Sequence, residues 1–579
     1  MNIKNYRRNL LSLLAVAAGF TLLIFPAAAV RAQSDAASLA SPISAPKDAT
    51  KIRLNTIGYL PNQEKKASIA AECSRFTVVR AKDGSKVYEG AVTGPVLNAD
   101  TNEQLYTADF SALKEPGEYQ LDVPGAGKSA PFRVAGDVYK QPFYTVMRSM
   151  YLWRCGTAVK GVYNGKTFSH EACHLEDAWM DSVTGEHVRK DGTKGWHDAG
   201  DYNKYTINAA MTVGTMLRAW QDFGPQIRKI TLDIPESGGK LPDFLAELKW
   251  EMDWLLTMQA PDGSVYHKIS TKQFGGFISP ELEKEPRFFT PWGSPATADF
   301  VAATAMAARN FQPYDQQYAD RLLQAAKKSY AFLKAHPENH KPEQKGFQTG
   351  AYETEDPDDR LWAAAELWET TGQADVLVDL ETRIKSANGK FDTDWDWPQV
   401  NNLGLFTYLL SNRSDRDEAL VAKVRENLLA TADGIVQTRN THGYARPLGS
   451  LYYWSCNGGT ARQTLTLYAA YRVSPKHEYL DTALDAVNHL FGRNCYGRSF
   501  VTGLGDRPPM HPHDRRSGTD KSADPWPGCI VGGPHPKATD WQDVQEDFRT
   551  NEIAINWNAA LIYALAAFVD TSDQTKGDL

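Results

Sequence analysis

Two segments far apart in the chain combine acidic side chains with aromatic residues and glycine. Residues 195–202 read GWHDAGDY and include Asp198 and Asp201, and residues 541–559 contain Glu552. Paired carboxylates are suited to cleaving glycosidic bonds, because one donates a proton to the leaving oxygen while the other activates water or attacks the sugar. The two segments therefore predict one active cleft assembled from distant parts of a domain.

The aspartate pair has a spacing with two interpretations. Asp198 and Asp201 are three residues apart and would point the same way in a helix or a tight turn. Ala199 and Gly200 keep the position between them small, so that backbone and substrate can approach closely. Pairs of this kind also cap ordinary loops. Spacing alone leaves catalysis and loop capping open.

Glu552 precedes a strongly apolar run over residues 553–569. We expect it to open a helix there, with Thr550 or Asn551 in the capping position. A glutamate in a first helical turn often serves only the helix dipole. Taken alone, Glu552 therefore indicates either a catalytic carboxyl or a helix-dipole residue.

A third block, residues 499–515, reads SFVTGLGDRPPMHPHDR and ends with His513 and Arg515. Imidazole and guanidinium groups can donate to sugar hydroxyls and can tune nearby carboxylates. A proline-rich basic loop without a function is the alternative.

Together the three blocks resemble the motifs of glycoside hydrolase family 9, whose best-known members are cellulases. The resemblance implies that Asp201 is the general base, that Asp198 helps to hold the attacking water, and that Glu552 is the general acid. It also implies that His513 and Arg515 contact the sugar and that hydrolysis inverts the anomeric configuration. As an acid, Glu552 must stay protonated near neutral pH, which requires a raised pKa.

Cys155, Cys173, His174 and His197 make a complete tetrahedral zinc set. Their spacing is loose, and a disulfide between the two cysteines is the natural competitor in an exported protein. Resemblance to family 9 enzymes with an N-terminal module favours a structural zinc, which would brace the loop that carries Asp198.

Residues 354–359 read TEDPDD and concentrate oxygen ligands ahead of a predicted helix. Family 9 often binds calcium near such a run, so the resemblance implies a calcium site with Thr354, Asp356, Asp358 and Asp359 as ligands. An acidic N-terminal helix cap is the alternative.

The elements that must position these residues fall into two classes. Residues 50–136 contain seven short, partly alternating runs separated by turn signals, which predict an immunoglobulin-like β-sandwich. The phrases at 54–61 and 114–119 resemble the N-terminal domain that precedes many family 9 catalytic domains. Support of the larger domain and sugar binding are both open as roles for this module.

Helical periodicity dominates residues 137–572. The clearest segments are 138–154, 207–223, 241–258, 297–310, 319–335, 361–371, 418–432, 461–471, 479–490 and 553–569. Twelve helices in two rings of six would form an α/α barrel, but a helix count does not separate this from another helical array. Family 9 resemblance implies the (α/α)6 barrel, and the chain is therefore predicted to be multidomain.

Residues 1–32 have the pattern of a signal peptide, with Arg7 and Arg8 ahead of an apolar run. An uncleaved membrane anchor is the alternative, because the run is nearly long enough to span. Residues 33–49 are rich in Ala, Ser, Pro and Asp and predict a disordered linker. We expect a secreted or periplasmic protein without stable membrane association after cleavage. The net charge of −7 argues against a nucleic-acid partner.

The sequence therefore predicts a monomeric hydrolase of β-1,4-glucans, with internal cleavage favoured. Loops 273–292 and 392–402 could wall its groove. Alternatives within the family are a chain-end cellodextrinase or glucosaminidase. A non-catalytic carbohydrate-binding protein has no need to keep Asp198, Asp201 and Glu552 together. A zinc hydrolase would need an open metal position, which a closed four-ligand site lacks.

Overall fold

The structure is a computed structural model that describes residue 46 and residues 48–519 and 523–569. The predicted signal peptide and most of the predicted linker lie outside these residues. Within the described ranges, no helix combines the length and the hydropathy that a membrane crossing needs.

Nine strands lie between residues 52 and 134, all linked by pairing. They are β1 (Ile52–Arg53), β2 (Gly58–Tyr59), β3 (Lys66–Ile69), β4 (Arg75–Arg80), β5 (Lys86–Asn98), β6 (Glu103–Asp109), β7 (Gly117–Val123), β8 (Gly127–Lys128) and β9 (Phe132–Val134). The order is β1-β3-β6-β5-β4-β7-β9-β2, with β8 paired to β7. In β7, Tyr119, Leu121 and Val123 are buried at alternate positions, as expected of a strand with one face on a core.

Strand β5 joins the two halves of this β domain. Its first part pairs with β4 and its second part, from Val92 to Asn98, pairs with β6. Of the seven short runs predicted from the sequence, the one at this position covers only residues 86–90. The strand continues because residues 92–98 pair with β6, and composition alone does not predict this second pairing.

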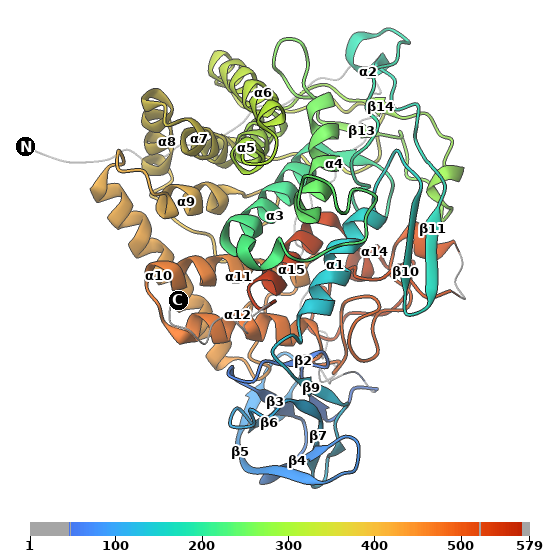
Figure 1. Cartoon of the computed structure of the whole chain (residues 1–579), viewed down its shortest axis with the longest axis vertical. Coiled ribbons are helices and arrows are strands. Elements are labelled where there is room, and N and C mark those ends of the chain that lie inside the picture. Colours follow the sequence, from blue (N-terminus) through green and yellow to red (C-terminus); the bar gives the residue numbers. More distant parts are fainter. Residues whose placement is uncertain (1–45, 47, 520–522, 570–579) are drawn as a thin grey trace, which may run out of the picture. The chain divides into compact units, whose positions relative to one another are not determined.

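Twelve helices of ten or more residues follow within the described part of the chain (Figure 1). They are α1 (Lys140–Leu152), α3 (Thr206–Ile227), α4 (Asp243–Thr257), α5 (Ser294–Phe311), α6 (Gln316–Ala335), α7 (Pro357–Thr371), α8 (Ala374–Ser386), α9 (Asn401–Leu410), α10 (Glu418–Thr441), α11 (Cys456–Val473), α12 (His477–Leu490) and α15 (Ile555–Ala566). The predicted segments cover all of these except α8 and α9. Helix α9 is buried on nearly every side, so it lacks the polar face on which periodicity depends.

Short elements occupy the connections between the helices. They are α2 (Asp181–Thr184), α13 (Arg515–Gly518), α14 (Phe548–Asn551), the 3₁₀ turn Pro280–Leu282, the hairpin of β10 (Val159–Tyr163) and β11 (Lys166–His170), and a small sheet of β12 (Lys204–Tyr205), β13 (Lys268–Ser270) and β14 (Phe288–Phe289).

Six of the long helices contact one another in a closed cycle. Helix α3 contacts α5, α5 contacts α7, α7 contacts α9, α9 contacts α11, α11 contacts α15, and α15 contacts α3. Helices α1, α4, α6, α8, α10 and α12 each contact one or more members of the cycle. The connections between the helices can therefore bring residues of distant sequence to one end of the cycle.

The β domain holds part of the third sequence block directly. The hydroxyl of Thr56 donates to the carbonyl of Phe491 at 2.7 Å and accepts from the N–H of Asp506 at 2.9 Å. Asp506 lies in the 499–515 segment that ends with His513 and Arg515. The β domain thus supports one of the candidate site segments.

Candidate active site

Backbone hydrogen bonds bring the predicted catalytic segments together. The carbonyl of Asp198 accepts from the N–H of Ile555 at 3.0 Å, and the carbonyl of Gly200 accepts from the N–H of Arg515 at 3.0 Å. Backbone groups have fixed geometry, so these bonds set the spacing of the segments more tightly than side-chain contacts would.

At Gly200 the backbone of the aspartate segment lies very close to the backbone of His513. A Cβ atom at this position would lie 2.2 Å from the carbonyl oxygen of His513. His513 in turn donates its backbone N–H to the carbonyl of Asn551 at 2.8 Å, next to Glu552. The small residue predicted between the aspartates is therefore required for contact between backbones.

Asp198 is almost fully buried, at 2% exposure. Its Oδ1 accepts from Asn208 Nδ2 at 2.7 Å, and its Oδ2 accepts from the Tyr352 hydroxyl at 2.7 Å. Burial and the neighbouring charge of Asp201 raise the pKa of Asp198, while these two hydrogen bonds act against the rise. Both carboxyl oxygens are thus fixed in direction.

Asp201 is 5% exposed and is held by side chains that follow it closely in sequence. Its Oδ2 accepts from Asn203 Nδ2 at 2.6 Å and from the Tyr205 hydroxyl at 3.3 Å. Burial raises the pKa of Asp201, and the positive charge of Arg515 and the Asn203 hydrogen bond oppose that rise.

Glu552 does not open a helix, contrary to the sequence prediction. It lies in extended backbone, at φ −72° and ψ 156°, between α14 and α15. Bridges pair His513 with Glu552 and Val531 with Ile553, and this pairing holds the backbone extended until α15 begins at Ile555. The helix-dipole interpretation therefore no longer applies.

The carboxyl of Glu552 is half-buried, and its pKa is raised well above the usual range. Burial is the largest cause, followed by the negative charges of Asp201 and Asp198. The charge of Arg515 and the N–H of Gly200 oppose the shift. Burial thus raises the pKa of all three carboxyls, and side-chain hydrogen bonds oppose the rise at Asp198 and Asp201.

His513 and Arg515 are oriented by backbone carbonyls. His513 Nδ1 lies 2.7 Å from the carbonyl oxygen of Gln545, so it donates there and leaves Nε2 for another partner. Arg515 Nε donates to the carbonyl of Gly275 at 3.0 Å, and its guanidinium lies over the ring of Phe274. Arg515 therefore lies against loop 273–292, and His513 contacts the same loop through the ring of Phe277.

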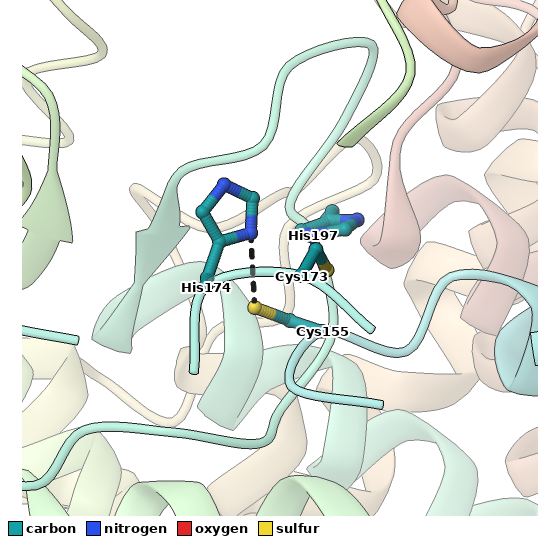
Figure 2. Close-up of side chains that lie close together, drawn as sticks. All are labelled: Cys155, Cys173, His174 and His197. Carbon is teal, nitrogen blue, oxygen red and sulfur yellow. Dashed lines mark hydrogen bonds between the residues drawn. The ribbon is translucent and has the colours of Figure 1, made fainter. Parts of the chain in front are cut away.

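The four predicted zinc ligands converge (Figure 2). Their ligand atoms all lie within 4.8 Å of one another, and they form the single group of three or more His, Cys, Asp or Glu residues suited to a metal in the described part of the chain. Cys155 Sγ lies 3.6 Å from His174 Nδ1, and Cys173 Sγ lies 3.7 Å from His197 Nε2. Tetrahedral zinc with ordinary bond lengths would separate sulfur and nitrogen by about 3.6 Å.

Two further observations fit a metal at this group. All six cysteines are free thiols, so Cys155 and Cys173 form no disulfide. His174 Nε2 lies 3.2 Å from a carboxyl oxygen of Glu283, in the arrangement by which carboxylates orient metal-bound imidazoles. The donor set is closed, which suits a structural ion rather than a reactive one.

The predicted calcium ligands contact separate partners. Asp356 pairs with Arg360 at 2.8 Å, Asp358 accepts from the N–H of Val400 at 2.6 Å, and the Thr354 hydroxyl donates to the carbonyl of Pro398.

Asp359 is fully buried beside Asp299, and neither carboxyl has a cationic partner among the described residues. The four predicted residues are therefore not gathered into one ligand group, and calcium stays a prediction.

Sequence reasoning missed the residues that hold the aspartates. Asn203 and Tyr205 follow Asp201 so closely that proximity could have indicated them. Asn208 on α3 and Tyr352 ahead of α7 gave no signal. Their contacts exist only once the helices have packed.

Comparisons with known proteins identify the family. The family model described as "Glycosyl hydrolase family 9" matches residues 139–565, and "Cellulase N-terminal ig-like domain" matches residues 47–128. The chain belongs to glycosyl hydrolase family 9. The predicted immunoglobulin-like domain and the predicted family are both confirmed.

Curated relatives of this family 9 chain include endoglucanases. Endoglucanase D of Acetivibrio thermocellus is 54% identical over 568 residues, covering 97% of this chain and 87% of the relative. A xyloglucan-specific endo-beta-1,4-glucanase of Bacteroides ovatus is 34% identical, covering 91% of this chain and 94% of the relative.

Among solved structures, a metagenome-derived family 9 endoglucanase matches with a TM-score of 0.83 at 33% identity, covering 90% of this chain and 99% of that one.

Replacing Gly200 with alanine should disrupt the contact between backbones. Because the new Cβ would meet the carbonyl of His513, the segments must separate. A misplacement of about 1 Å can cost ~10²-fold in rate, so we expect a loss of that order in kcat. Steady-state kinetics on a soluble cellulose derivative measures it.

Gly136→Ala is the matched control, since a Cβ there meets nothing within 4 Å and it should keep full activity. Unchanged kcat in Gly200→Ala would contradict the proposed tight contact.

Proposed function

We propose that this family 9 protein is an inverting endo-β-1,4-glucanase, with Glu552 as general acid, Asp201 as general base and Asp198 as the residue that orients the attacking water. The observation that carries the proposal is the hydrogen bonding of three neighbouring carboxyls whose pKa values are all raised by burial. Asp198 and Asp201 each accept two side-chain hydrogen bonds that favour the charged form, and their negative charges raise the pKa of Glu552 further.

The proposed reaction is a single displacement. Glu552 gives its proton to the glycosidic oxygen as the bond to the anomeric carbon breaks. Water attacks that carbon from the opposite face and loses its proton to Asp201, while Asp198 accepts the water's second hydrogen bond. At the end Glu552 is ionised and Asp201 protonated, and proton exchange with solvent resets both residues.

His513 and Arg515 are proposed to bind the sugar beside the cleavage point. Each is held by a backbone carbonyl, so little side-chain entropy remains to be lost on binding. The positive charge of Arg515 also favours the ionised form of Asp201, which a general base requires.

Internal cleavage of β-1,4-glucan is the proposed mode, because relatives at 54–56% identity over most of this chain are named endoglucanases. A protein named cellodextrinase from Butyrivibrio fibrisolvens is 32% identical, which keeps trimming of short oligosaccharides as the second candidate.

The domain division is proposed as an immunoglobulin-like domain over 50–136 and an (α/α)6 barrel over 137–572. The closed cycle of six helices, with six more against it, supports the barrel. Contacts of Thr56 with the 499–515 segment favour a supporting role for the first domain. Export through a signal peptide over 1–32 is proposed from its sequence pattern.

We propose a structural zinc at Cys155, Cys173, His174 and His197. The convergence of two thiols and two imidazoles supports it, and a solved structure titled as a zinc-binding triple mutant of the family 9 endoglucanase J30 matches this chain with a TM-score of 0.82. When bound, the ion would fix the segment directly before Asp198. Calcium near Asp359 is retained as a lesser proposal, since the buried carboxyls of Asp299 and Asp359 lack a positive partner among the described residues.

Glu552→Gln should fold normally and lose nearly all activity. An amide cannot supply the proton that the leaving oxygen needs, and general acid catalysis contributes ~10²–10⁴-fold. Wild-type protein should lower the viscosity of a soluble cellulose derivative well before it releases many reducing ends, as internal cleavage requires.

Glu552→Gln should neither lower the viscosity nor release reducing ends. Its rate should recover partly on a substrate with a dinitrophenol leaving group, because that group needs no protonation. Full activity of the variant on the polymer would refute the acid assignment.

Cys173→Ser should lower zinc content and thermal stability together. Metal binding contributes to folding free energy when the ligands are deprotonated, so loss of one thiolate weakens both. Elemental analysis and thermal denaturation measure them, and Cys529→Ser, outside the ligand group, is the control. A zinc-free wild type, or a variant with unchanged stability, would contradict a structural metal.

A further inference from the structure

Glu283 lies where two parts of the site meet. It follows the 3₁₀ turn Pro280–Leu282, is 8% exposed, and places Oε2 3.2 Å from Nε2 of His174. The other ring nitrogen of His174, Nδ1, faces Cys155 Sγ at 3.6 Å. The imidazole thus has one nitrogen toward the ligand group and the other toward a carboxylate.

The same carboxylate packs against the loop that borders the candidate active site. A Cβ on Gly275 would lie 2.5 Å from Glu283 Oε1, so the second carboxyl oxygen lies against the Gly275 backbone. The carbonyl of Gly275 is the acceptor for Arg515 Nε at 3.0 Å. The buried side chain of Glu283 and the peptide unit of Gly275 thus connect His174 to Arg515.

Other contacts fix the same loop near the site. The hydroxyl of Tyr202, directly after Asp201, donates to the carbonyl of Ile278 at 2.6 Å. The ring of Phe277 lies edge-on to His513 with centroids 5.3 Å apart. Residues 272–283, here called the strap, therefore lie against His513 and Arg515. Glu283 links the strap to the cysteine and histidine group through His174.

We propose that Glu283 is a positioning residue that couples the Cys155–Cys173–His174–His197 centre to the sugar-binding guanidinium of Arg515. One oxygen orients His174 for the metal, and the other sets the position of the Gly275 carbonyl that holds Arg515. The inference rests on the proposed zinc and on the proposed role of Arg515, and it adds a residue that neither the motifs nor the ligand set contain.

The substitution Glu283→Gln tests both connections with little change in shape. Carboxylate partners of metal-bound histidines typically contribute 10–100-fold to affinity, so zinc should pass to a chelator more readily by about that factor. KM for cello-oligosaccharides should rise more than kcat falls, because Arg515 is displaced while Glu552 stays in place. Trypsin should also cleave faster at Lys272, the first residue of the strap, and at Lys284, directly after it.

Glu281→Gln is the matched control. It removes the same charge two residues away, where the carboxylate accepts from the Ser279 hydroxyl, and all three measurements should match wild type. Excess zinc salt should restore metal occupancy of Glu283→Gln but leave its KM raised, because the Gly275 contact is separate from the metal.

The outcomes distinguish this inference from the function it rests on. An unchanged zinc affinity, or an unchanged KM and cleavage rate, in folded Glu283→Gln would overturn the coupling while the hydrolase remains. A wild type without zinc would overturn the metal half of the proposal together with the zinc assignment. A wild type inactive on every β-glucan would overturn the proposed function, and the coupling to a sugar-binding arginine with it.

Discussion

The close approach of backbones at Gly200 is the constraint on which the candidate site depends. The backbone N–H groups of Ile555 and Arg515 donate to the carbonyls of Asp198 and Gly200. A side chain at Gly200 would collide with the carbonyl of His513. Three carboxyls from two distant segments are thereby brought together. Their mutual repulsion favours one retained proton among them, which we propose that Glu552 carries.

Two other parts of the structure lie against the segments that meet at Gly200. Thr56 of the β domain contacts the 499–515 segment, and the cysteine and histidine group includes His197, directly before Asp198. Loops are the natural place for functional residues, but they need a rigid scaffold to keep distances constant. Here the closed cycle of helices provides that scaffold. We propose that Glu283 connects the cysteine and histidine group to Arg515.

Sequence reasoning singled out the segments that the structure brings together, because it used their residue types and spacing directly. It misplaced Glu552 in a helix, since the apolar run 553–569 looks continuous while bridges to other segments keep its start extended. It also missed Asn208, on the helix that follows the aspartate pair, and Tyr352, which reaches Asp198 from far along the chain. Such partners depend on tertiary packing, which the local periodicity of the sequence does not predict.

In the proposed mechanism Asp201 activates a water and does not attack the sugar itself. An inverting pair leaves room for that water, with carboxyls ~6.5–9.5 Å apart, whereas a retaining pair stands at ~5–5.5 Å. Proton NMR of the first product released from a β-linked cello-oligosaccharide distinguishes the two roles of Asp201. We expect the α-anomer to appear first and then to mutarotate. Initial release of the β-anomer would contradict inversion and make Asp201 a nucleophile.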